Sequence, residues 1–201
     1  MNSCLTDLYF LPSIAFFREI KSFDEIQIEA SENFVKQTYR NRAHFLAPNG
    51  VQQLNIPVLK AQSKQLYKDV KIDYTEDWNR KNNQALKSAY SNSPFYYDYD
   101  VFIQKIFNKK HIFLFDLNYS LLEFCFKVLD FDKIINQTQT FKLAYSDIDL
   151  REVKFGKRKN CSHWLPNDIK SYQQMFGKEF VNNLSIIDLM FNKGPESIKY
   201  L

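Results

Sequence analysis

The chain has 201 residues, a net charge of only +4, and 19 Phe and 12 Tyr but just four Gly. This composition predicts one domain, residues 1–201, with an aromatic-rich core. The modest charge argues against a dedicated nucleic-acid binder, for which a strongly basic stripe is expected. No apolar run approaches the roughly 20 residues that span a bilayer, so no membrane span is predicted.

Three cysteines, Cys4, Cys125 and Cys161, are far apart and odd in number, and no CxxC pair or secretion signal accompanies them. We therefore expect a cytoplasmic protein with reduced thiols. Cys161 lies near His163, but without a second pair at ligand spacing no metal site is favoured. No cofactor is predicted, because the chain also lacks a Walker A loop and a GxGxxG motif.

The chain opens with a pattern typical of a strand, a helix and a second strand. Residues 5–10 predict a short buried strand, and residues 14–20 predict an aromatic helix after Pro12. In residues 25–29, Ile26 and Ile28 alternate with polar residues, as in a strand. This opening is βαβ-like, although the pattern leaves open whether the two strands run parallel.

A hairpin is predicted next, because Asn49-Gly50 separates residues 43–47 from residues 51–56 and suits a type I′ turn. If the incoming strand continues back to Tyr39, alternation places Arg40, Arg42 and His44 on one face. Two guanidinium groups and an imidazole on one extended segment would form an anion platform, since the planar fork of Arg suits phosphate or carboxylate.

The alternative for this segment is a solvated face whose arginines pair with nearby acids such as Glu29 and Glu32. Exposed charge at a sheet edge is common in proteins because it discourages pairing with other chains. The sequence does not choose between the anion platform and the solvated face.

The rest of the chain is mainly helical in its pattern, around a turn at residues 91–99 and an irregular, charged segment at residues 146–167. The expected elements are a strand at 69–72, a helix at 78–90 capped by Asp77, a helix at 101–107, a long helix that starts at about Phe113 or Asn118 and ends at Leu129, a strand at 136–143, a short helix at 172–176, and a helix from Ser185 to Gly194-Pro195. The fold class is therefore α+β or α/β: an N-terminal strand–helix–strand and hairpin sheet packed with a mainly helical C-terminal half.

Asn82 stands out on the buried stripe of the helix at residues 78–90, among apolar side chains. A buried amide needs hydrogen-bond partners, so Asn82 either bonds neighbouring backbone or lines a polar cavity. Both alternatives stay open at this stage.

Motifs in a characteristic order run along nearly the whole chain. They are Phe10-Leu11-Pro12, Lys36, Thr38-Tyr39-Arg40-Asn41-Arg42, Asn49-Gly50, Leu54, Pro57, Trp78, Tyr90, Ser93-Pro94-Phe95, Asp116-Leu117-Asn118, Asn183 to Leu189, and Phe191 to Pro195. By these motifs the chain resembles the WbqC-like family of bacterial proteins, in its shorter branch typical of the Bacteroidetes.

The resemblance implies a role in bacterial surface polysaccharide biosynthesis, such as that of O-antigen, and implies ligand contacts from Asn41, Trp78, Asn82, Tyr90 and Asn118. Two departures concern chemistry. Many relatives carry His-Gln-Pro where this chain has Thr6-Asp7-Leu8, and a His where it has Asn82. An imidazole can act as a base near neutral pH, whereas an amide can only form hydrogen bonds.

Three functions follow from these patterns. The first is a transferase-type enzyme acting on an anionic activated sugar or acyl donor: Arg40 and Arg42 hold the phosphate or carboxylate, Lys36 neutralises developing charge, and His44 or Asp7 moves a proton. The second is a non-catalytic binding or assembly protein of the same pathway. The third is a nucleic-acid binder that uses the basic run at residues 154–159 and the Arg40/Arg42 face with nearby aromatic residues, and the modest net charge disfavours it.

Overall fold

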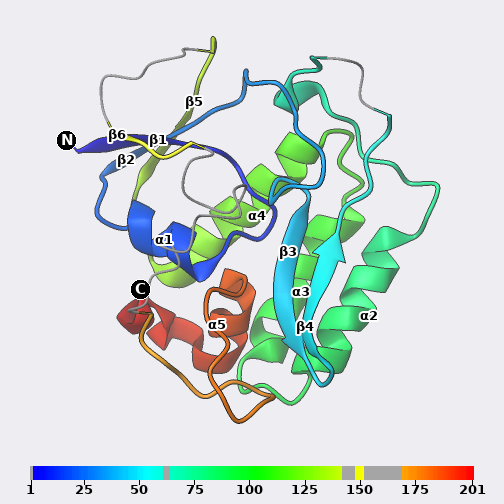
Figure 1. Ribbon diagram of the computed structural model, residues 1–201, viewed down its shortest axis with the longest axis vertical. Helices are drawn as coiled ribbons and strands as arrows, with labels where there is room; N and C mark the ends of the chain where they lie inside the picture. The colour runs from blue at the N-terminus through cyan, green and yellow to red at the C-terminus, as the bar shows by residue number, and fades with distance from the viewer. Residues whose placement is uncertain (1, 61–63, 142–147, 152–168) are drawn as a thin grey trace.

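The strand–helix–strand opening forms the left part of Figure 1, in a computed structural model that describes residues 2–60, 64–141, 148–151 and 169–201. Strand β1 (Ser3–Thr6) pairs in parallel with β2 (Glu25–Ile28), and helix α1 (Ile14–Ile20) connects them. The structure therefore confirms the predicted opening and shows that its strands are parallel.

Two short strands from the second half of the chain complete this sheet. Strand β5 (Ile134–Gln137) pairs in parallel with β2, and β6 (Ile148–Asp149) pairs in parallel with β1. The strand order is β5-β2-β1-β6. The chain thus adds β2 and β5 on one side of β1 and then adds β6 on the other side. In open parallel sheets, such a reversal is the place where ligands tend to bind, beyond the carboxyl ends of the strands.

The two faces of the sheet differ because side chains alternate along each strand. Cys4, Ile26 and Ile28 point into the main hydrophobic core, whereas Leu5 and Gln27, which are opposite each other in the register, point to the other face. The strand predicted at residues 5–10 ends earlier, at Thr6. Beyond Thr6 the chain turns away from the sheet, and Phe10 donates a backbone hydrogen bond to the Tyr39 carbonyl (2.9 Å).

The predicted hairpin is confirmed: β3 (Arg42–Ala47) pairs antiparallel with β4 (Gly50–Asn55), and Ala47 lies opposite Gly50. The predicted turn type is wrong. Pro48 is the first loop residue, and its ring fixes φ at a negative value that a type I′ turn does not allow. The positive φ, +100°, falls on Gly50 at the start of β4. Because β3 starts at Arg42, the strand also does not continue back to Tyr39.

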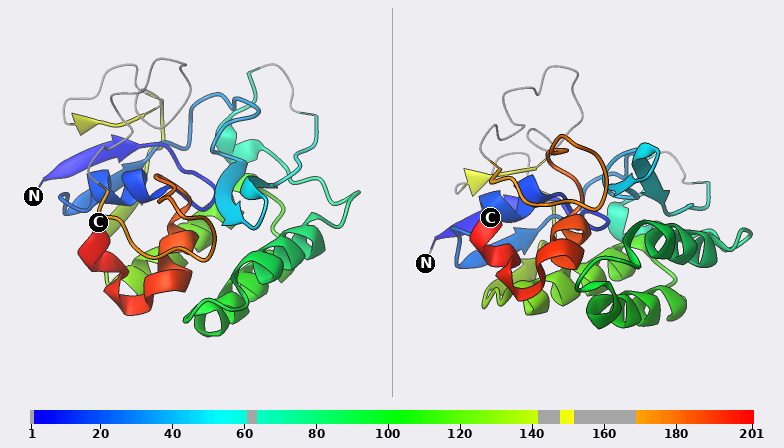
Figure 2. Two further views of the ribbon diagram at one scale, coloured as in Figure 1. Left: turned by 60° about the horizontal axis from the view of Figure 1, so that its bottom comes forward. Right: turned by 90° about the horizontal axis from the view of Figure 1, so that it is seen from below.

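Helices α2 (Trp78–Tyr90), α3 (Tyr96–Asn108) and α4 (Leu114–Leu129) lie together on one side of the strands (Figure 2). Asp77 caps α2 as predicted, since its carboxylate accepts from the Arg80 backbone N–H. Helix α3 begins at Tyr96, before the predicted start at residue 101. The aromatic residues 96–99, which the sequence assigned to a turn, belong to its first turn. The Tyr96 ring packs edge-on against Phe191 at 5.2 Å.

Helix α5 (Ile186–Lys193) follows Ser185 as predicted and contacts both α3 and β3. Gly194 ends the α-helix, and the chain continues as a 3-10 helix, η3 (Gly194–Tyr200). The helix predicted at residues 172–176 is wrong, because these residues form no regular structure. At the predicted strand 69–72 the structure has a 3-10 helix, η1 (Tyr67–Asp69), followed by isolated bridges at Lys71 and Ile72.

The mixed α/β fold class is confirmed, with N-terminal strands, a small antiparallel hairpin and mostly helical structure after residue 77. No helix among the described residues is long and apolar enough to cross a membrane. The basic run at residues 154–159, Cys161 and His163 lie outside the described residues.

Candidate functional site

Arg40 does not lie on an open platform: its guanidinium turns inward and is only 2% exposed. Its Nη2 donates to Asp7 Oδ1 at 2.7 Å and also to Glu32 Oε2, and its Nη1 donates to the Asn33 carbonyl at 3.0 Å. Burial lowers the pKa of Arg40, but the carboxylates of Asp7 and Glu32 outweigh that effect and raise it above its ordinary value. Arg40 is therefore permanently charged and neutralised within the fold.

Asn118 belongs to the same buried network. Its Nδ2 donates to the Arg40 carbonyl (2.7 Å) and to the Tyr67 hydroxyl (2.6 Å), which in turn donates to the Leu8 carbonyl (3.0 Å). The Arg40 guanidinium also lies 5.0 Å from the centre of the Tyr67 ring. The structure thus brings together three predicted site residues, Asp7, Arg40 and Asn118, but in the interior.

A second buried ion pair occupies the carboxyl edge of the parallel sheet. Glu29, which directly follows β2, is completely buried and accepts from Arg151 Nη1 at 3.0 Å. Arg151 follows β6 and also binds Asp149, at 2.6 Å. Asp7 follows β1, so adjacent strands each end in a carboxylate that is held by an arginine. These ion pairs neutralise the two carboxylates, Asp7 and Glu29, beside the point where the strand order reverses.

The open part of the predicted platform is a polar face of the hairpin. Arg42 and His44 are half-buried and alternate along β3 with buried Ala43, so they share one face. Gln53 lies opposite His44, and Asn55 lies opposite Arg42. We call these four side chains, Arg42, His44, Gln53 and Asn55, the open hairpin face.

Arg42 differs from Arg40 in its partners. Within the described parts of the chain it forms no ion pair, and its shielded Nε has no hydrogen-bond partner. Arg42 also affects its neighbour: burial and then the Arg42 charge lower the pKa of His44. The open hairpin face therefore combines a cation that no described carboxylate neutralises with an imidazole that is neutral at neutral pH and can accept a proton.

Aromatic rings connect this face to the interior. The Tyr39 ring lies edge-on to His44 at 5.5 Å and to Tyr9 at 6.4 Å. The Tyr9 hydroxyl donates to Asp7 Oδ2 at 3.0 Å. The sequence-predicted pair of alternative bases, His44 and Asp7, is thus joined through two tyrosines, with His44 at the accessible end.

Two predicted asparagines border the open hairpin face through Asn55. Asn82 Nδ2 donates to the Asn55 carbonyl at 3.2 Å, and Asn41 Nδ2 donates to Asn55 Oδ1 at 3.4 Å and to the Ile56 carbonyl at 3.0 Å. Of the two alternatives for Asn82, the structure thus shows the bond to neighbouring backbone. This bond ties α2 to the end of β4.

The remaining predicted site residues lie elsewhere. Tyr90 is completely buried, and its hydroxyl donates to Asp188 Oδ1 at 2.7 Å while it accepts from the Leu46 N–H at 3.2 Å. Trp78 is buried against Phe107, with ring centres 5.5 Å apart. Lys36 is exposed on the loop between β2 and β3. Neither Tyr90 nor Trp78 presents its side chain to solvent.

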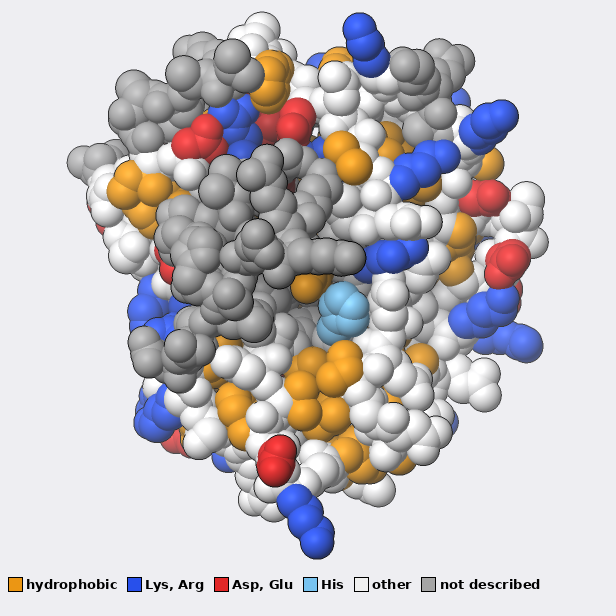
Figure 3. Space-filling model, viewed as in Figure 1, with side chains coloured by type: hydrophobic (Ala, Val, Ile, Leu, Met, Phe, Trp, Pro, Cys, Tyr) orange, Lys and Arg blue, Asp and Glu red, His pale blue; other side chains and the backbone are white. Residues whose placement is uncertain are grey.

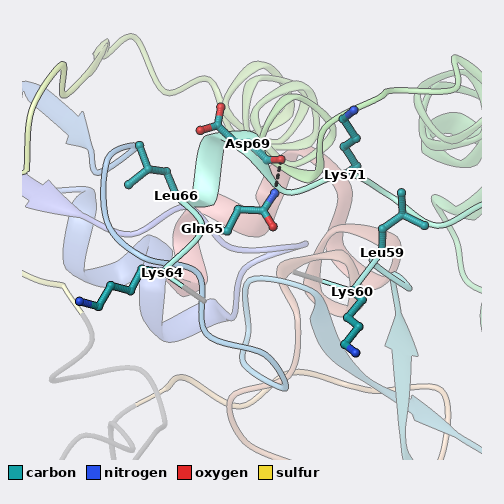
Figure 4. Close-up of a pocket in the computed structure, with 7 residues that line it drawn as sticks. All are labelled: Leu59, Lys60, Lys64, Gln65, Leu66, Asp69 and Lys71. Atoms are coloured by element: carbon teal, nitrogen blue, oxygen red, sulfur yellow. Dashed lines mark hydrogen bonds between the residues drawn. The ribbon is translucent and has the colours of Figure 1, made fainter. Parts of the chain in front are cut away.

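The lysines beside η1 do not converge on one site. A cavity of about 520 Å³ beside η1 is lined by Lys60, Lys64 and Lys71, together with Asp69. Figure 4 shows that the three amino groups point away from one another, so they do not converge on one ligand. Among the described side chains on the face shown in Figure 3, basic groups are likewise spread out and interspersed with acids.

Comparison with protein families confirms the family resemblance that the motifs indicated. The model of the WbqC-like protein family matches residues 8–153 and 147–200. The chain belongs to the WbqC-like family. It is also 24% identical to the uncharacterized protein Rv1507c of Mycobacterium tuberculosis, over 96% of this chain and 94% of that protein. No solved structure matches the chain.

Sequence reasoning did not assign a role to three polar residues of this WbqC-like chain, Gln53, Asn55 and Arg151, and it considered Glu29 only as a possible partner of Arg40 or Arg42. Counting back from the hairpin turn would have placed Gln53 and Asn55 beside His44 and Arg42, because opposite residues share a face. The sequence offered Glu29 as a partner for Arg40 or Arg42, but in the structure Glu29 pairs with Arg151. Its pairing with Arg151 joins residues 122 positions apart, and no local pattern predicts it.

Proposed function

We propose that this WbqC-like chain is a transferase-type protein of surface polysaccharide biosynthesis that binds an anionic activated donor, a nucleotide sugar or an acyl donor, at the open hairpin face. The observation that carries the proposal is the environment of Arg42. Its guanidinium has no ion-pair partner among the described residues, whereas Arg40 and Arg151 are both neutralised internally. An unpaired, half-buried guanidinium is suited to a phosphate or carboxylate.

His44 supplies the second part of the proposed chemistry. Its lowered pKa keeps the imidazole neutral at neutral pH, as a general base requires. In the proposed transfer, an acceptor hydroxyl loses its proton to His44 while its oxygen bonds to the donor carbon. The bond from that carbon to the leaving phosphate or thiolate breaks, and Arg42 stabilises the negative charge that the leaving group takes with it.

Asp7 is less suited to moving the proton than His44 is. It is 1% exposed, bound by the Arg40 guanidinium, and hydrogen-bonded by the Tyr9 hydroxyl. We therefore assign Asp7 and Arg40 to holding the segment that leads into β3, and assign acid–base chemistry to His44.

Thermal shift assays with uridine diphosphate glucose, thymidine diphosphate glucose, guanosine diphosphate mannose and acetyl coenzyme A test the proposal. We expect at least one donor to raise the melting temperature of the wild type and to raise that of Arg42→Ala by much less at the same concentration. Gln52→Ala, an exposed change on β4, is the matched control and should respond as the wild type does. If no donor stabilises the wild type, or if Arg42→Ala responds fully, the proposal is wrong.

Asn82 favours a second candidate, a binding protein of the same pathway that performs no chemistry. At this position its amide is engaged by the backbone of β4, and an amide cannot transfer protons at neutral pH. The same donors separate the two functions. A binding protein is stabilised but releases no nucleotide or coenzyme A when an acceptor sugar is added, and His44→Asn then leaves its affinity unchanged.

A further inference from the structure

The outer side of helix α3 carries large apolar side chains that remain exposed. Tyr97, Val101 and Phe102 are 68%, 46% and 47% exposed, and Tyr97 is the most exposed large apolar residue in the described part of the chain. Their spacing of four and five residues puts them on one side of the helix. Ile103 is completely buried on the opposite side. A helix that is apolar on both sides is usually covered on both.

Aromatic contacts hold this outer face in shape. The Phe102 ring stacks on Phe124 of α4 with ring centres 6.1 Å apart, and Tyr99 lies edge-on to the same ring at 6.3 Å. Tyr97 packs edge-on against the buried Tyr96 at 5.1 Å. Because contacts within the fold already hold these rings, binding at this face would cost little further side-chain entropy.

Two opposite charges lie on the same face, one toward each end of α3. Asp98 is in the first turn and Lys105 is in the last turn, and both are exposed. They are seven residues apart, or about 10 Å along the helix axis, with Val101 and Phe102 between them. Lys105 Nζ lies 5.7 Å from the centre of the Phe102 ring, and neither charge forms an ion pair with a described residue. Both charges are therefore available to a partner.

The order of these charges fits a second copy of the chain that runs in the opposite direction. A twofold axis between Val101 and Phe102 places Asp98 of each copy opposite Lys105 of the other. In a parallel arrangement, each charge would face its own kind. A twofold contact requires a surface that is complementary to itself, and the outer face of α3 meets this requirement.

We propose that the outer face of α3 is the contact surface of a symmetrical dimer of this chain. The exposed apolar side chains supply the area that is buried. The two Asp98–Lys105 pairs set the register and the antiparallel direction. The dimer does not depend on donor binding, because the open hairpin face is made of β3 and β4 residues alone.

Analytical ultracentrifugation over a range of protein concentrations tests the dimer. We expect the wild type to associate to twice the 24.0 kDa mass of one chain. Asp98→Lys leaves two positive charges at these positions, and Lys105→Asp leaves two negative ones. Each variant alone therefore repels its own copy and should associate more weakly by at least about tenfold. An equimolar mixture of the two variants should associate as tightly as the wild type, because each copy then meets the opposite charge.

Asp132→Lys is the matched control for a charge reversal elsewhere. Asp132 is exposed, and its neighbour Lys133 donates to the Lys21 and Phe23 carbonyls, which places it beside the end of α1. This variant should associate as the wild type does.

Circular dichroism checks the fold of each variant. If either reversal unfolds the chain, Val101→Glu replaces it, since it puts a charge at the centre of the contact on a half-exposed position and should also weaken association. The inference is overturned if the wild type stays monomeric, if the folded variants associate as tightly as the wild type, or if the mixture of folded reversals does not recover association.

Discussion

Arg40 and Arg42 are two residues apart, yet the structure places them in opposite environments. Arg40 is buried with two carboxylates and a backbone carbonyl around its guanidinium, whereas Arg42 has no ion pair within the described part of the chain. A buried, neutralised arginine joins segments of the fold, and an unneutralised one can receive a ligand. The comparison teaches that charge alone does not identify a site: the partners of each charge decide its role.

The largest expected effect is on the free energy of unfolding, which should fall much further in Arg40→Ala than in Arg42→Ala. Arg40→Ala leaves Asp7 buried without its cation, and removing one partner of a buried ion pair costs roughly 3–5 kcal/mol. Arg42→Ala breaks no ion pair to a described residue, so we expect a change of about 0.5 kcal/mol or less. Urea unfolding followed by circular dichroism measures both.

A paired substitution sharpens the interpretation of Arg40. Asp7→Leu/Arg40→Leu removes both charges together, so it should be much less destabilising than Arg40→Ala alone. Losses of roughly 3–5 kcal/mol in both Arg40→Ala and Arg42→Ala would mean that both arginines are structural, and small losses in both would mean that neither is; either result would remove the distinction between them.

The next effect concerns affinity. Once a donor that stabilises the wild type is known, Arg42→Ala should weaken its binding by about tenfold to a hundredfold, since a hydrogen bond to a charged group contributes roughly 1.5–3 kcal/mol. Arg42→Lys keeps the charge but loses the two-pronged geometry, so we expect it to recover only part of the affinity. Calorimetric titration gives the three dissociation constants. Full affinity in Arg42→Ala would move the anion site elsewhere.

The smallest effect is a shift in the titration of His44. Burial and then the Arg42 charge lower its pKa, so NMR should show a midpoint below the ordinary value of about 6.5. In Arg42→Ala the midpoint should rise but stay below that value, because burial remains. An unchanged midpoint would show that Arg42 does not act on His44.

The same shift predicts the direction of a pH effect on stability. The unfolded chain binds the His44 proton more readily, because its pKa there is higher than in the folded state. The contribution of a neutral His44 is thus complete above about pH 6.5 and is lost as the pH falls through the lowered folded pKa. His44→Gln should flatten this part of the pH profile of the unfolding free energy.

A structural feature of this protein can be predicted from its sequence when the residues that determine it are neighbours in the chain. The cap at Asp77, the stripe of α2 and the hairpin at Gly50 rest on neighbours in sequence, and the structure confirms all three elements. The start of β3 could not be predicted in this way. Arg40 continues the polar alternation of Arg42 and His44, but buried contacts with Asp7 and Glu32, 33 and 8 residues away, turn its side chain inward.

The same reason explains the site residues that the sequence did not reveal. Asn82 was recognisable as an anomaly on an apolar stripe, but its partner on β4 depends on how α2 packs against the hairpin. Glu29 and Arg151 meet only because β1, β2 and β6 lie side by side in one sheet. Local patterns name the elements, whereas the pairing of buried charges follows from their arrangement in space.

The most direct test follows the Nε–H groups of the arginines by ¹H–¹⁵N NMR while uridine diphosphate glucose or another stabilising donor is added, with Arg42→Lys used to assign the Arg42 signal. We predict that the Arg42 signal shifts with saturation and that the Arg40 signal stays in place, held by Asp7 and Glu32. A shift of the Arg40 signal, with Arg42 unaffected, would contradict the assignment of the open hairpin face as the anion site.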